Sequence, residues 1–245
     1  MKQKAALILL TFVLGISMSA CASGSVQSVT GSEEGKDADE ADEADDDYAL
    51  EVPESVQNLS EEDGLLLAGE LKDGVYINNY FGYKLSVPEG GTIIRDNDDA
   101  LSTNEFLPLS KTYEDGWGGW SYSAEIAGVD GSITVFITAL SDDETGLTEK
   151  ELVEKHIKAN QEIDKLLGDD EDVDGDGTGS EEGPKNTTVI LAGEEHPASV
   201  DISRVDGNDY LSACLYIPKG DFEYIIYLSG PDLKPEDLTK YFEKP

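Results

Sequence analysis

The pattern of apolar and polar positions predicts a chain built mainly from short antiparallel strands. Apolar residues alternate with polar ones in short stretches that end at glycine, proline, asparagine or aspartate. A two-residue hairpin signal, Asp73–Gly74, connects the first two stretches. We expect strands at 65–72, 75–78, 81–87, 121–127, 132–140, 187–192, 198–205, 210–217 and 222–229. The last four follow one another directly, which is typical of an antiparallel meander.

One long stretch has the helical period instead. Thr148 and Glu151 have the spacing of a capping box, in which each side chain accepts a hydrogen bond from the other residue's backbone N–H. The apolar face that follows repeats every three or four residues and consists of Leu152, His156, Ala159, Ile163 and Leu166. We expect this helix to end near Gly168. A short closing helix is expected to begin at Pro235 and to dock through Leu238, Tyr241 and Phe242.

These elements predict an α+β fold, in which a twisted antiparallel sheet is covered by one long and one short helix. The order is hairpins, the long helix, a meander and the closing helix. We place all of them in a single domain over 64–245. An acidic insert at 169–183 separates the long helix from the meander.

The N-terminal segment has the pattern of a secretory signal. Lys2 and Lys4 precede an apolar run over 5–16, which is short for a permanent membrane-spanning helix. The small residues at 19–20 suit a peptidase that must approach the backbone closely. We therefore expect a signal peptide over 1–20.

Cys21 follows, and with it the segment resembles the lipobox of bacterial lipoproteins. In that family the cysteine becomes the lipid-modified first residue of the mature chain. The resemblance implies acyl chains such as palmitate on Cys21 and a lipid-anchored protein at the extracytoplasmic face of the cell membrane. Met18 departs from the family, which mostly has leucine at that position. The alternative is an ordinary signal peptide that is cut elsewhere.

Acidic residues dominate the segment that follows the cysteine. Between Glu33 and Glu54 there are twelve acidic residues and one lysine. So few apolar side chains cannot offset the entropy lost on ordering, and the like charges repel one another. We expect a disordered acidic tether over 21–63.

The charge of the whole chain limits its partners. It has 53 acidic and 17 basic residues, which give a formal net charge of -36 at pH 7. A field of this sign repels phosphate backbones, so we expect no nucleic-acid partner and membrane contact only through the N-terminal lipid. With Cys21 lipidated, Cys214 has no disulfide partner and is most simply a buried small residue in a monomer.

A short aromatic motif lies between the second and third expected strands. It consists of Tyr76-x-Asn78-x-Tyr80-Phe81-Gly82-Tyr83-Lys84-x-x-Val87-Pro88. Together with the order of the elements, it resembles the secreted lipoprotein relatives of the photosystem II extrinsic PsbP-like fold. The resemblance spans about 64–242 and implies a fold with several non-catalytic roles, but it transfers no functional residue.

The acidic insert contains the spacing of a calcium-binding loop. It resembles an EF-hand loop, which implies as ligands Asp170, Asp172, Asp174, the Asp176 carbonyl and Glu181. Two features depart from that family: Gly177 stands where an apolar residue is usual, and no helix follows the loop. The alternative is a flexible acidic loop that gathers cations weakly. No cofactor other than Ca²⁺ is expected.

Two tryptophans, Trp117 and Trp120, flank a pair of glycines. They suggest an exposed aromatic platform for a sugar or a peptide. The alternative is a loop folded over the core, with glycine where side chains do not fit.

Residues suited to catalysis are few. His156 lies on the inward face of the expected helix, His196 is expected in a turn before Pro197, and no nucleophile-elbow, P-loop, zinc-protease or dinucleotide motif is present. We therefore expect a non-enzymatic binding or assembly module of the cell envelope, whose partner is a protein, a glycan or a peptide. A cation-binding module is the first alternative. An envelope hydrolase is the second, and a cleft with a buried polar pair would favour it.

Overall fold

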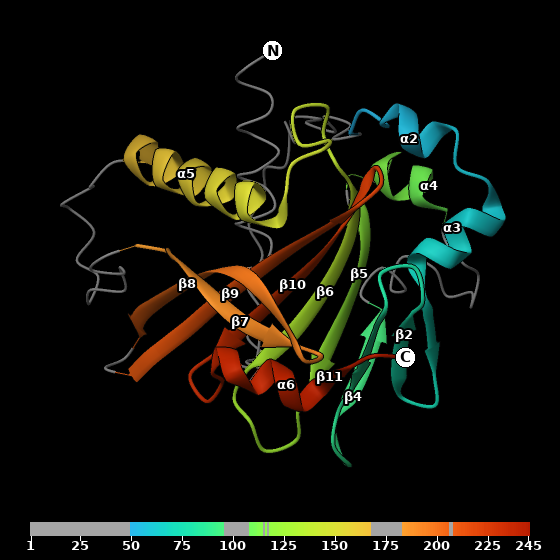
Figure 1. Ribbon diagram of the computed structural model, residues 1–245. Helices are drawn as coiled ribbons and strands as arrows, with labels where there is room; N and C mark the ends of the chain where they lie inside the picture. Colours follow the sequence, from blue (N-terminus) through green and yellow to red (C-terminus); the bar gives the residue numbers. More distant parts are fainter. Residues whose placement is uncertain (1–49, 96–107, 115, 117, 168–182, 206–207) are drawn as a thin grey trace, which may run out of the picture.

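The computed structural model describes residues 50–95, 108–114, 116, 118–167, 183–205 and 208–245. Two antiparallel sheets and several helices make up this part, which confirms the α+β class (Figure 1). Within these residues no helix is long and apolar enough to cross a membrane.

The larger sheet has seven strands in the order β4-β5-β6-β10-β9-β8-β7. They are β4 (Thr92–Arg95), β5 (Gly119–Glu125), β6 (Ser132–Ala139), β7 (Lys185–Leu191), β8 (Glu194–Val205), β9 (Asn208–Lys219) and β10 (Phe222–Gly230). The predicted meander is confirmed, because β7, β8, β9 and β10 each pair with the next. β6 joins the other side of β10 and pairs with β5, so the strands predicted at 121–127 and 132–140 lie side by side.

The smaller sheet has the order β1-β2-β3-β11. Its strands are β1 (Glu70–Lys72), β2 (Val75–Asn78), β3 (Tyr83–Ser86) and β11 (Phe242–Glu243). Asp73 and Gly74 have φ angles of 51° and 75°, so the predicted two-residue turn is confirmed. The expectation of a single sheet is wrong. Phe242 pairs with Leu85, and the early hairpin therefore completes its own sheet with the C-terminus.

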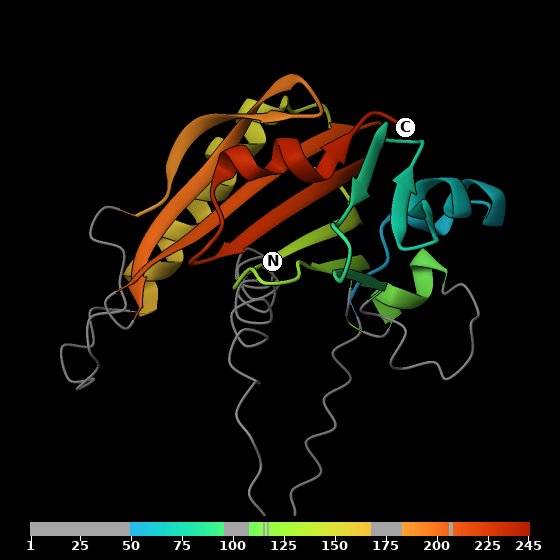
Figure 2. The same ribbon diagram turned by 90° about the horizontal axis from the view of Figure 1, so that it is seen from below.

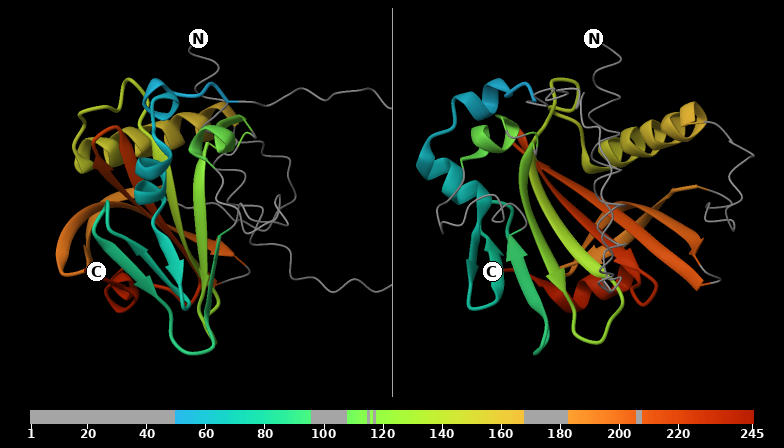
Figure 3. Two further views of the ribbon diagram at one scale, coloured as in Figure 1. Left: turned by 90° about the vertical axis from the view of Figure 1, so that its right-hand side faces the viewer. Right: turned by 180° about the vertical axis from the view of Figure 1, so that it is seen from behind.

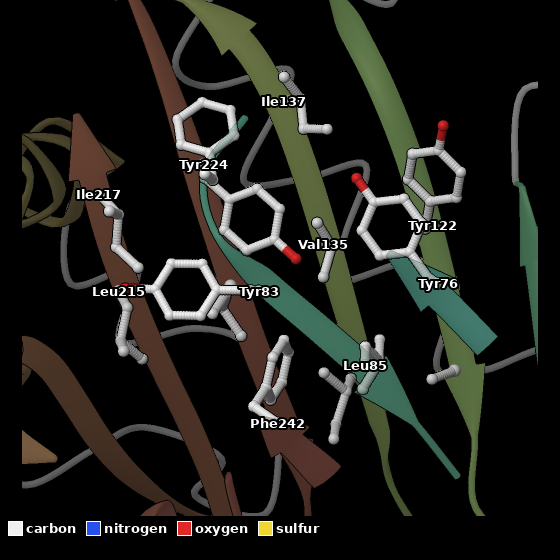
Figure 4. Close-up of a cluster of buried hydrophobic side chains, with 14 of the residues drawn as sticks. Tyr76, Tyr83, Leu85, Tyr122, Val135, Ile137, Leu215, Ile217, Tyr224 and Phe242 are labelled. Atoms are coloured by element: carbon white, nitrogen blue, oxygen red, sulfur yellow. The ribbon is translucent and has the colours of Figure 1, made fainter. Parts of the chain in front are cut away.

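The apolar faces of the two sheets meet in one core (Figure 4). Tyr83 from β3 stacks on Tyr224 from β10 with ring centroids 5.7 Å apart, and Tyr76 from β2 stacks on Tyr122 from β5 at 4.2 Å. The hydroxyls of Tyr76 and Tyr122 both donate to the carbonyl of Ala68, so these buried groups are paired.

Helix α5 (Glu149–Leu167) lies on the face of the larger sheet that points away from the smaller sheet (Figure 2). Its predicted capping box is confirmed. The Thr148 N–H donates to Glu151 Oε2 at 2.8 Å, and the Glu151 N–H donates to Thr148 Oγ1 at 3.4 Å. Leu152 and Val153 are buried against Tyr216 and other residues of the sheet, so the inward face of the helix begins where the sequence predicts it.

Helix α3 (Glu61–Ala68) replaces the strand that the sequence predicts at 65–72. Ser60 caps this helix by accepting the Asp63 N–H at 3.1 Å, and the acidic first turn interacts favourably with the helix dipole. Gly69, with φ of 77°, ends the helix, and only Glu70–Lys72 is extended. The predicted strand is therefore wrong: the cap at Ser60 starts a helix and Gly69 ends it, so most of the segment between them is helical.

Residues 50–63, which the sequence assigns to the tether, pack on the domain instead (Figure 3). The Leu50 N–H donates to the Tyr113 carbonyl at 3.0 Å, which joins this segment to α4 (Leu109–Glu114). Val56 in α2 (Glu54–Gln57) is buried. The boundary at 64 is therefore too late, because four apolar residues of the segment reach the core: Leu50, Val52, Val56 and Leu59.

The closing helix consists of a 3₁₀ turn, η3 (Pro235–Asp237), followed by α6 (Leu238–Tyr241). Pro235 lies in the first turn as predicted, and Leu238 and Tyr241 are buried. α6 lies beside β7, on the sheet face opposite α5 (Figure 2). α5 is the one long helix expected, but α2, α3 and α4 accompany α6, so a single short helix is too simple a description.

Candidate functional site

The tryptophans do not form the platform that the sequence suggests. Trp120 belongs to β5, opposite Ile137, and only 1% of its surface is exposed. A side chain at Gly119 would lie 2.4 Å from the Ile137 carbonyl, so glycine is required beside it. Trp120 is therefore a core residue, as the alternative interpretation holds. Trp117 lies outside the described residues.

His196 forms a buried hydrogen-bonded chain rather than lying in a turn. Its Nδ1 is 2.9 Å from Glu149 Oε2, and its Nε2 is 3.3 Å from the Tyr83 hydroxyl. Burial, together with the carboxylates of Glu149 and Glu194, raises the pKa of Tyr83 to about 12. The turn expectation is wrong, because the turn lies at 192–193 and β8 already begins at Glu194.

This chain of side chains joins three parts of the fold. Tyr83 comes from the smaller sheet, His196 from the larger sheet and Glu149 from the start of α5. Lys244, near the C-terminus, also contacts this group of side chains. Its Nζ lies 4.7 Å from the centre of the Tyr83 ring and 2.8 Å from Glu194 Oε2. Since Tyr83 and His196 are both buried, the arrangement holds elements together.

A second polar cluster lies between α5 and the larger sheet. His156 stacks on Tyr216 with ring centroids 4.1 Å apart, which confirms that it faces inward. Glu144 accepts hydrogen bonds from Ser141 Oγ at 2.6 Å and from Lys155 Nζ at 2.9 Å. Glu223 on β10 is only 4% exposed. Its Oε2 and the Nε2 of His156 have no hydrogen-bond partner among the described residues.

The environment sets the protonation state of each group in this second cluster. Burial, together with the nearby charge of Glu144, raises the pKa of Glu223 to about 8. Burial also lowers the pKa of His156. Burial opposes ionisation of Glu144 as well, but its hydrogen bonds from Ser141 and Lys155 keep its pKa below the ordinary value. At neutral pH the cluster therefore combines a protonated Glu223, a neutral His156 and an ionised Glu144.

Glu223 is the residue of this cluster that sequence reasoning missed. A signal was present, since it is the one charged residue in the apolar run 222–229. Paired titratable groups of this kind occur at catalytic sites and also in structural networks. The Glu223 carboxyl is buried and therefore not accessible to a substrate in this structure.

Cys214 packs beside this cluster on β9. Although part of the residue reaches the surface, burial raises the pKa of its thiol to about 12. The thiol stays protonated at physiological pH, which fits the expected role of a small packing residue.

A free strand edge lies along β7, the last strand of the larger sheet, which among the described residues pairs only with β8 (Figure 1). The two-residue turn at 192–193 makes Leu191 and Glu194 a hydrogen-bonded pair. Hydrogen-bonded and non-hydrogen-bonded pairs alternate along an antiparallel ladder. The outward N–H and C=O groups of β7 are therefore those of Asn186, Thr188 and Ile190.

A shallow hollow of about 160 Å³ lies beside this edge. Thr188 and Ile190 form one wall, and the other wall is formed by Pro235, Glu236 and Thr239 from η3 and α6. Ile190 is 38% exposed. The volume is below that of a usual small-molecule pocket, which is at least about 300 Å³, and it suits a single side chain of an extended segment.

The remaining candidate residues lie outside the described part of the chain. These are Cys21 and the calcium-loop residues Asp170, Asp172, Asp174, Asp176 and Glu181. Within 50–95, 108–114, 118–167, 183–205 and 208–245, no three histidine, cysteine or acidic side chains are grouped to hold a metal ion. Lipidation and calcium binding therefore stay proposals from the sequence.

Comparisons with known proteins give no family. No protein-family model and no curated protein sequence matches the chain. Among solved structures, a protein from Bacteroides thetaiotaomicron matches with a TM-score of 0.33 and 9% identity, over 67% of this chain. The match covers 45% of that protein, so this chain spans less than half of its length.

Proposed function

We propose that the protein is a lipid-anchored binding or assembly module at the extracytoplasmic face of the cell membrane. The observation that supports a binding role is the open edge of β7 with the hollow beside it. Exposed strand backbone next to a side-chain pocket is a common means of holding an extended protein segment. The central residues of both polar clusters, Tyr83 and His196 in one and Glu144 and Glu223 in the other, are buried instead and stabilise the fold that carries this edge.

The anchor is proposed from the N-terminal pattern, which resembles a lipoprotein signal ending at Cys21. A single acyl chain binds membranes only marginally, whereas two chains hold a protein stably. The lipoprotein modification would supply both chains at Cys21 and make the membrane the first partner of this protein.

The anchor predicts the behaviour of a Cys21→Ala variant in cells. Without the thiol no acyl chain can be attached, so we expect the protein to leave the membrane fraction or to accumulate unprocessed. Incorporation of a labelled palmitate analogue should be lost as well. Cys214→Ala is the matched control and should keep both properties, because that residue lies on β9 of the domain. Unchanged membrane partition of Cys21→Ala would contradict the anchor.

The binding role can be tested by site-specific cross-linking in intact cells. A photoreactive amino acid at position 190 should give discrete adducts with an envelope component, because this side chain is exposed beside the hollow. The same amino acid at position 89, an exposed site outside the strands, is the control and should give no such adduct. If neither these positions nor other exposed positions of the domain give an adduct, a binding role is excluded.

A further inference from the structure

We infer that β7 captures an extended, basic segment of a partner protein by adding it as a further strand to the seven-stranded sheet. This inference rests on the proposed binding function and specifies the mode of binding and the chemistry of the partner. It follows from the lack of protection at this edge, the backbone groups that face outward and the charges beside them.

Within the part of the chain that the structure describes, the edge of β7 lacks the features that protect natural edge strands. Such edges are usually short, charged, bulged or interrupted by proline, since exposed backbone otherwise pairs with other chains. β7 has seven residues, and after Lys185 the strand is uncharged and free of proline. Its seven pairs with β8 follow without a bulge.

The other sheet edges in the described part of the chain differ in this respect. β1 has three residues, two of which are the charged Glu70 and Lys72. β11 has two residues, and β4 has four and ends in Arg95. The length and neutrality of β7 are therefore specific to this edge.

The register identifies the backbone groups that a partner would meet. Asn186, Thr188 and Ile190 face outward, and within the described residues no backbone hydrogen bond is made on that side. Pro197 supports this assignment. It stands opposite Thr188, where its missing N–H would have faced β9, and pairing of β8 with β9 begins only at Ser199.

The charges beside the edge favour a basic segment. Ile190 lies opposite Glu195 on β8 and shares the hollow with Glu236. Both carboxylates are exposed, and neither forms an ion pair within the part of the chain that the structure describes. Glu195 lies on the face of the sheet away from the core, and Glu236 lies on the face that carries η3 and α6. The side chains of an added strand alternate between these two faces, so a lysine or arginine on either face would meet one of the two acids.

A second copy of this chain is a poor occupant of the same edge. Each copy has a formal net charge of -36, and pairing two such surfaces would bring like charges together. A basic partner would be attracted by the same field.

The inference predicts selective binding of a model peptide by the full chain in detergent. The probe is a labelled seven-residue peptide, as long as β7, in which valine or threonine alternates with lysine. Fluorescence anisotropy should show saturable binding, and a peptide with glutamate in place of lysine should bind at least about ten-fold more weakly.

Substitutions separate the backbone contribution from the charge contribution. Thr188→Pro removes an outward N–H without breaking a bond to β8, and we expect at least about a ten-fold loss of peptide affinity. Thr188→Ala keeps that N–H and should bind as the parent does. Glu236→Lys should shift the preference toward the glutamate peptide. Glu89→Lys makes the same charge change at a residue that does not line the hollow and should not shift it.

Hydrogen exchange then tests strand addition directly. Bound peptide should slow exchange of the amides of Asn186, Thr188 and Ile190. Binding without this protection, equal binding of both peptides, or a dimer that Thr188→Pro dissociates would overturn the inference. Adducts in cells that persist in Thr188→Pro would leave the binding function in place and reject β7 as its site.

Discussion

The Glu223 carboxyl keeps its proton at a pH where an exposed glutamic acid has lost it. Burial raises its pKa from an ordinary 4.5 to about 8. Between these values the folded protein binds a proton that the unfolded chain releases. Folding stability is therefore highest below pH 4.5 as far as this group is concerned, falls as the pH rises to about 8 and then levels off.

Glu223→Gln should remove this dependence, because the amide is neutral at every pH. Denaturant unfolding at pH 5 and pH 9 should show that the parent loses stability over this range at about 1.4 kcal/mol per pH unit up to its pKa, and that the variant loses much less. At pH 9 the variant should be the more stable protein. Glu89→Gln, at an exposed position, is the control and should behave as the parent. Equal pH dependence of parent and Glu223→Gln would show that the carboxyl ionises freely.

At the scale of elements, α5 depends on the cap at its N-terminus. Thr148→Ala removes the side-chain acceptor for the Glu151 N–H, so we expect a loss of about 1 kcal/mol in the free energy of unfolding. Thr148→Ser keeps the hydroxyl and is the matched control, with a much smaller loss. Urea unfolding at pH 7 measures both. A Thr148→Ala variant as stable as the parent would mean that packing alone holds this helix.

Local signals account for the elements that the sequence predicts correctly. The turn at Asp73–Gly74, the capping box at Thr148 and the alternation along the meander each involve neighbouring residues. Local signals did not predict β4 or α3, and the reason differs between the two. β4 is too short to show a clear alternation, and the leucines of 65–67 suit a strand as well as a helix until the cap at Ser60 is considered.

The candidate site and the second sheet belong to the scale of the whole molecule. β7 has an open edge because it is the last strand of its sheet. One wall of the hollow beside it is formed by η3 and α6, from the C-terminal part of the chain. On the side away from β2, β3 likewise pairs with β11, more than 150 residues later. Pairings of this kind leave no mark in a local pattern, so the strands of the meander could be predicted but not which of their edges stays free.

The hydrogen bond between Leu50 and Tyr113 limits how far the domain can lie from the membrane. If Cys21 carries the proposed anchor, 28 residues, 22–49, separate it from this docked segment, and a flexible chain of that length would span about 30 Å on average. Partners would then have to present their segment within that distance of the membrane plus the distance from Leu50 to β7 across the domain. For a partner held in the same membrane, such confinement gives an effective concentration of order millimolar, so even weak pairing at one strand edge would leave the two proteins mostly associated.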